Sequence, residues 1–207
     1  MKLIIFDMDG TVVNSGTMIA NSINYVRKNI GLVELEKDIL LENINNPHIN
    51  PAEFFYGSNH FTENQTELFC QFYEKNCVVG VEIYNGIENL LEELHPDYTL
   101  TIATNASSIF ANKILNHLKI DKYFTRVIGA DMVKNPKPQA DMLLKTMDEL
   151  KIEKSDTILI GDSEKDMISA QKAGIKHILV NWGFSKYDEN AVNNVDELKK
   201  IVKQNHR

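Results

Sequence analysis

The 207-residue chain has few cysteines and no long apolar run near its start. Its two cysteines, Cys70 and Cys77, have a spacing that fits neither a disulfide framework nor a metal-binding pair. We therefore expect both thiols to be packing residues in a reducing compartment. The first apolar run, residues 3–6, is too short for a signal peptide or a membrane span. A cytoplasmic protein without a membrane partner is expected.

The chain also has fewer basic than acidic residues, with 22 lysines and arginines and 29 aspartates and glutamates, which gives a net charge of -7. This balance disfavours a nucleic-acid backbone or an anionic membrane as the main partner. The hydrophobic fraction of 43% and the charged fraction of 25% are typical of a soluble globular protein. We expect a monomer or a weak dimer.

Short apolar runs that end in polar or acidic residues recur along the chain, and each has the length of a strand buried on both faces. Stretches with helical spacing lie between them. This alternation predicts an α/β fold, a Rossmann-like, doubly wound parallel sheet with helices on both faces. The predicted strands are residues 3–6, 98–103, 126–128, 157–160 and 177–180.

Local signals refine this pattern. Pro138 suits the first turn of the helix that follows it, and Gly174 suits the position just past the end of the preceding helix. The polar segment 190–194 is expected to be a loop.

The stretch from residue 14 to residue 81 interrupts the alternation, because it holds helical patterns and no convincing strand. Apolar residues over 18–30 and over 68–73 fit two amphipathic helices, and a polar segment lies between them. We expect residues 14–81 to form an inserted all-α segment. Residues 1–13 and 82–207 would then form the α/β core.

The segment Asp7-Met8-Asp9-Gly10-Thr11 directly follows the first predicted strand. Two carboxylates so close together repel each other unless a cation lies beside them, and Mg²⁺ prefers such oxygen ligands. Asp7 is then placed for attack on a phosphorus atom, and Asp9 can act as a general acid. Gly10 would let the backbone approach the phosphate closely.

A second acidic segment, Gly161-Asp162-Ser163-Glu164-Lys165-Asp166, follows another predicted strand and opens a helix. Because ligands of such sheets bind at the carboxyl ends of the strands, Asp162 should lie on the same edge as Asp7. Asp162 is the candidate metal ligand. Asp166 is expected either as a further ligand or as a group that holds ligands and water.

Phosphoryl transfer also needs donors that stabilise negative charge. Thr104 and Asn105, at the end of the second long apolar run, supply a hydroxyl and an amide. Lys137 supplies a cation from a loop that two prolines stiffen. Among the histidines, His48 is the best candidate for a substrate contact.

These four segments, in this order, resemble the motifs of the haloacid dehalogenase superfamily, and the resemblance covers nearly the whole chain. Within it, the chain looks most like the phosphoglycolate phosphatases and related mutases. The resemblance implies a helical cap, Asp7 as nucleophile, Asp9 as acid and base, and Thr104 with Lys137 as phosphate clamp. It also implies Mg²⁺ held by Asp7, the Asp9 carbonyl and Asp162.

The expected activity is that of a phosphoric monoester hydrolase, a magnesium-dependent phosphatase that uses an aspartyl-phosphate intermediate. Its substrate would be a phosphoglycolate-like molecule or a sugar phosphate. A sugar-phosphate mutase of the same family stays open, because the core motifs do not separate the two. A receiver-like phosphoacceptor signalling module also combines acidic residues, a threonine or serine and a lysine, although such modules are about half as long.

Overall fold

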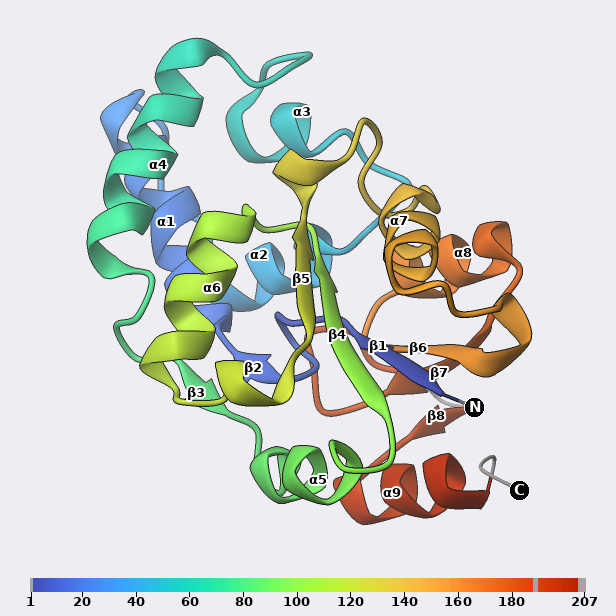
Figure 1. Cartoon of the computed structure of the whole chain (residues 1–207). Helices are drawn as coiled ribbons and strands as arrows, with labels where there is room; N and C mark the ends of the chain where they lie inside the picture. Colours follow the sequence, from blue (N-terminus) through green and yellow to red (C-terminus); the bar gives the residue numbers. More distant parts are fainter. Residues whose placement is uncertain (1, 188–189, 205–207) are drawn as a thin grey trace.

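A six-stranded parallel sheet forms the centre of the fold in the computed structural model, which describes residues 2–187 and 190–204. The strand order is β5-β4-β1-β6-β7-β8, so β1 lies between β4 and β6 (Figure 1). The strands are β1 (Leu3–Phe6), β4 (Thr99–Thr104), β5 (Arg126–Gly129), β6 (Thr157–Gly161), β7 (Lys176–Val180) and β8 (Ala191–Val192).

The predicted strands agree with the structure to within one residue at each end. The prediction of a loop over residues 190–194 is wrong, because β8 pairs there with β7. The two apolar residues of β8 are too short a run to stand out among polar neighbours. Residues 1, 188–189 and 205–207 of the expected core lie outside the described part of the chain.

The prediction for Pro138 is also wrong, because the helix that follows it begins only at Asp141. A turn closed by the Gln139 amide, which donates to the Pro136 carbonyl at 2.9 Å, precedes the helix instead. Gly174, in contrast, ends its helix in the left-handed conformation, with φ of 74°, as predicted.

Alternate residues of β1 face opposite sides of the sheet, as a strand buried on both faces requires. Ile4 and Phe6 belong to one apolar core, and Leu3 and Ile5 belong to the other. The first core is covered by α5 (Ile87–Leu94), α6 (Ser108–His117) and α9 (Val195–Gln204). The second is covered by α7 (Asp141–Leu150) and α8 (Glu164–Ala173).

Four helices separate two short strands that pair in an antiparallel ribbon, β2 (Val13–Asn14) and β3 (Glu82–Ile83). They are α1 (Gly16–Asn29), α2 (Lys37–Ile44), α3 (Pro51–Tyr56) and α4 (Glu63–Asn76). Within the described residues, the segment between β2 and β3 contains no strand.

Helices α1 and α4 pack against each other, with the rings of Tyr25 and Phe72 stacked at 4.6 Å. Helix α4 also lies beside α6 of the core (Figure 1), where the Tyr73 and Phe110 rings meet at 5.0 Å. Helix α4 therefore joins this helical segment to the sheet and its helices. Over the residues that the structure covers, no helix has both the length and the apolar character needed to cross a bilayer.

Candidate active site

Three neighbouring strands bring the sequence motifs to one edge of the sheet. Asp7 follows β1, Thr104 ends β4, and Asp162 follows β6. Phe6, the last residue of β1, pairs with β4 on one side and with β6 on the other. Because all three strands are parallel, their carboxyl ends meet at the same edge.

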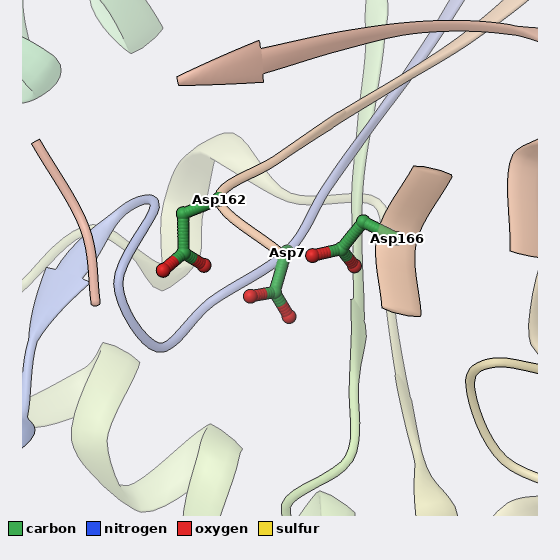
Figure 2. A group of neighbouring side chains, drawn as sticks. All are labelled: Asp7, Asp162 and Asp166. Atoms are coloured by element: carbon green, nitrogen blue, oxygen red, sulfur yellow. The ribbon is translucent and has the colours of Figure 1, made fainter. Parts of the chain in front are cut away.

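The carboxylates of Asp7, Asp162 and Asp166 form one buried cluster (Figure 2). One oxygen from each lies within 4.8 Å of the other two. Asp166 reaches the cluster from the first turn of α8, directly after the loop that carries Asp162. The structure thus brings together three of the four residues predicted as metal ligands.

Lys137 supplies a buried cation to this cluster. Its ammonium lies 2.6 Å from Asp7 Oδ1 and 2.6 Å from Asp166 Oδ1, and its side chain is only 3% exposed. Burial alone would lower the pKa of Lys137, but the charges of Asp166 and Asp7 outweigh it and raise the pKa. The two carboxylates therefore favour the charged form of Lys137.

One lysine does not balance three carboxylates. Burial raises the pKa of Asp7, with Asp166 and Asp162 adding to the effect and Lys137 opposing it. Burial, followed by the charge of Asp166, raises the pKa of Asp162 to about 7. With all three acids ionised, two negative charges remain uncompensated. A divalent cation with a preference for oxygen ligands, such as Mg²⁺, fits this donor set.

The loop around Asp162 is shaped to hold its carboxylate. Oδ2 accepts a hydrogen bond from the Phe184 amide at 2.7 Å, and Oδ1 accepts a long one from Thr11 Oγ1 at 3.4 Å. A Cβ atom added to Gly10 or to Gly183 would lie 2.3 Å from Asp162 Oδ2. Gly10 also has φ of +87°, which favours glycine. In this structure, Gly10 thus makes room for Asp162.

Asp9 lies beside the cluster with its own hydrogen bonds. Ser15 Oγ donates to Asp9 Oδ1 at 2.5 Å, and Thr104 Oγ1 donates to Asp9 Oδ2 at 3.4 Å. Burial raises the pKa of Asp9, against the effects of Ser15, Lys137 and Thr104. A carboxyl group with a raised pKa holds a proton more readily, which suits a general acid.

Asn105, a predicted phosphate ligand, holds the lysine loop. Its side-chain Nδ2 donates to the Lys137 backbone carbonyl at 2.8 Å. Asn105 and Thr104 both line a cavity of about 310 Å³ that also contains Asp7, Asp9 and Lys137. The lining also includes a group of apolar and aromatic residues: Ile19, Ile44, Phe69, Cys70, Tyr73, Phe110 and Phe184.

His48, the predicted histidine contact, does not line this cavity. Its ring Nε2 lies 3.1 Å from Glu164 Oε1, and its side chain is 72% exposed. The inserted segment instead contributes Asn45 to the cavity.

Sequence reasoning missed several groups that support the acidic residues. Ser163 caps α8 and bonds the Asp166 carboxylate, a pattern that the Ser-x-x-Asp spacing could have revealed. Ser15, the Phe184 amide and the indole of Trp182, which donates to the Thr11 carbonyl at 3.0 Å, have no comparable sequence signal.

The sequence profile of one family, described as haloacid dehalogenase-like hydrolase, matches residues 4–180. This span contains every candidate site residue and most of the chain. The chain belongs to this family. Two comparisons extend the match over nearly the full length of this hydrolase.

A phosphoglycolate phosphatase of Aquifex aeolicus is 30% identical over 187 residues, which cover 90% of this hydrolase and 87% of that protein. A crystal structure of a predicted phosphatase from Clostridium acetobutylicum superposes with a TM-score of 0.86 at 28% identity and covers 98% of both chains. These findings confirm the expected fold and the expected class, a phosphoric monoester hydrolase.

Proposed function

We propose that this protein is a Mg²⁺-dependent phosphatase that hydrolyses a small phosphomonoester through an aspartyl-phosphate intermediate on Asp7. The observation that carries the proposal is the position of Asp7 in the cavity that Asp9 also lines. The Asp7 carboxylate lies beside those of Asp162 and Asp166 and 2.6 Å from the Lys137 ammonium. Relatives named phosphoglycolate phosphatase support a small, phosphoglycolate-like substrate, and a sugar phosphate is the alternative.

Asp7 and Asp162 would hold the Mg²⁺ ion, together with the Asp9 carbonyl that the family resemblance implies. Asp166 would either join them or orient Lys137, to which it is bonded at 2.6 Å. When bound, the cation would neutralise charge on the phosphoryl oxygens.

The reaction on the protein side has two steps. In the first, a carboxylate oxygen of Asp7 attacks phosphorus, the bond from phosphorus to the ester oxygen breaks, and Asp9 gives its proton to the departing alcohol. In the second, Asp9 takes a proton from water while the water oxygen attacks phosphorus. The acyl-phosphate bond then breaks, which frees Asp7 and inorganic phosphate.

Thr104 and Lys137 would stabilise the phosphoryl charge during both steps. We also propose that residues 14–81 act as a cap over the core of residues 1–13 and 82–207. The cavity has walls from both parts, since Ile19 and Phe69 come from the first and Phe110 from the second. Cap contacts would exclude water from the first step.

The direct test is Asp7→Asn, which keeps the shape of the side chain and removes the nucleophilic carboxylate. We expect turnover of p-nitrophenyl phosphate with Mg²⁺ to fall by at least ~10³-fold, as for loss of a nucleophile. Asp148→Asn is the matched control, because Asp148 lies on the exposed side of α7 and its side chain is 81% exposed. Full activity of Asp7→Asn would disprove the assignment.

Product analysis separates the remaining alternatives. A phosphatase releases inorganic phosphate from glucose 1-phosphate, whereas a mutase returns glucose 6-phosphate. A receiver-like module would form a long-lived phosphoprotein with acetyl phosphate and show no turnover, but the hydrolase family match argues against it.

A further inference from the structure

The cavity contains a second lysine that the proposed reaction does not use. Four charged side chains line it: Asp7, Asp9, Lys137 and Lys165. The Lys137 ammonium is engaged by two carboxylates at 2.6 Å. The Lys165 ammonium donates to the Ile44 backbone carbonyl of α2 at 2.9 Å. Ile44 lines the cavity too, so this ammonium lies at the cavity wall.

The Lys165 ammonium is partly buried, and its positive charge is poorly neutralised by its neighbours. Among the residues that the structure describes, no carboxylate lies within ion-pair distance of its ammonium. Burial lowers the pKa of Lys165, and Lys137 adds to this effect, while Asp166 opposes it. An ammonium has three N–H donors, so the bond to one carbonyl leaves two of them for another acceptor.

The surroundings show what kind of acceptor would fit. The surface of the cavity is mainly apolar, with Phe69, Phe110 and Phe184 among its lining residues. Asn45, next to Ile44, also lines the cavity, and its side-chain amide has no hydrogen bond within the described chain. An anionic group on the substrate would find its cation at Lys165 and a neutral donor at Asn45.

We propose that Lys165 is a specificity-determining residue that binds a second anionic group, a carboxylate or a phosphate, on the leaving-group side of the substrate. The proposal rests on the proposed function and deepens it. The phosphoryl group would react at Asp7, while Lys165 binds the other end of the same small molecule. Substrates would therefore be phosphomonoesters with two anionic groups.

Matched substrate pairs test this directly. The first pair is 2-phosphoglycolate and 2-hydroxyethyl phosphate, which differ by a carboxylate in place of an alcohol. The second pair is glucose 1,6-bisphosphate and glucose 1-phosphate, which differ by a phosphate. In kcat/KM, the wild type should prefer the member with the second anionic group in at least one pair, and the pair that discriminates identifies the anion.

Lys165→Met removes the charge and keeps the length of the side chain. We expect it to lower kcat/KM for the preferred substrate with the second anionic group by ~10- to 100-fold, as for a lost charge-assisted hydrogen bond, mainly through a higher KM. The substrate without the second anion should change by less than ~3-fold, the scatter typical of surface substitutions. Lys165→Arg should restore part of the preference.

Lys172→Met is the matched control, because Lys172 also lies on α8 and also donates to a neutral oxygen, Gln139 Oε1 at 2.9 Å. It should leave both substrates unaffected. If Lys165 only tethers α2 through the Ile44 carbonyl, Lys165→Met would lower turnover of both members of each pair equally, which would overturn the proposal. A wild type that hydrolyses no phosphomonoester would instead refute the proposed function itself.

Discussion

At the scale of single residues, the site depends on two glycines as well as on its charged side chains. A Cβ atom added to Gly10 or to Gly183 would lie 2.3 Å from Asp162 Oδ2, which is too close for any side chain. The same carboxylate accepts a hydrogen bond from the Phe184 amide. The position of Asp162, and so the shape of the acidic cluster, depends on two residues that carry no chemistry of their own.

Gly10→Ala should therefore affect catalytic activity more than the stability of the fold. A methyl group at Gly10 must displace Asp162, and a misplaced catalytic group of this kind can lower turnover by ~10²-fold. Gly31→Ala is the control, because Gly31 has φ of +80° but no atom within 4 Å of an added Cβ. Both variants should lose about 1–2 kcal/mol of stability from the left-handed backbone.

Steady-state kinetics and denaturant unfolding, measured on both variants, check this prediction. Equal activity in the two variants would mean that Asp162 tolerates displacement.

At the scale of elements, helix termini support the site. Helix α8 begins with a reciprocal capping box in which Ser163 and Asp166 bond each other's backbone amides. Because Asp166 also binds Lys137, the start of this helix and the position of the lysine are coupled. Helix α4, which contributes Phe69 and Tyr73 to the cavity, has a second capping box between Thr62 and Gln65.

Thr62→Ala should lower the free energy of unfolding by about 1 kcal/mol, because it removes the hydroxyl that accepts from the Gln65 amide at 3.3 Å. Thr66→Ala, one turn further along α4, removes an exposed hydroxyl that serves no cap and should have a smaller effect. Urea denaturation of the two variants compares them. A larger loss for Thr66→Ala would show that the box does not stabilise α4.

At the scale of the whole molecule, the acidic cluster exists only in the folded chain, since Asp7 and Asp162 are far apart in sequence. Folding gathers these carboxyl groups in a buried place, which raises their pKa values. Their ordinary pKa is about 3.9 in the unfolded chain. Between pH 4 and pH 7 the folded state therefore binds more protons than the unfolded state.

By linkage, this difference makes the metal-free protein less stable as pH rises from 4 to 7. The Asp162→Asn side chain does not titrate between pH 4 and pH 7. The variant should therefore lose less stability over this range than the wild type, by on the order of a few kcal/mol. In EDTA, the variant should thus gain stability relative to wild type as pH rises. With Mg²⁺ at neutral pH, the order should reverse, because only the wild type keeps the Asp162 carboxylate of the proposed metal site.

Thermal unfolding with EDTA and with Mg²⁺, across this pH range, provides the measurement. A parallel pH dependence for the two proteins in EDTA would contradict the raised pKa of Asp162.

Most strand positions could be read from the sequence, because a strand buried on both faces leaves a continuous apolar run, as residues 3–6 and 157–160 do. β8 could not, because pairing with β7 and not composition makes it a strand. Pro138 predicts the wrong start for α7 for a similar reason. The turn between Pro136 and Gln139 depends on a local hydrogen bond that the proline alone does not reveal.

The sequence by itself determined that Asp7, Thr104 and Asp162 would meet, because parallel strands end at a common edge wherever they lie in the chain. Only the tertiary structure decided that Lys137 bridges Asp7 and Asp166, and that Lys165 reaches the carbonyl of Ile44. These contacts join segments up to 130 positions apart. They depend on loop paths and helix packing, which leave no periodic pattern among the residues that make them.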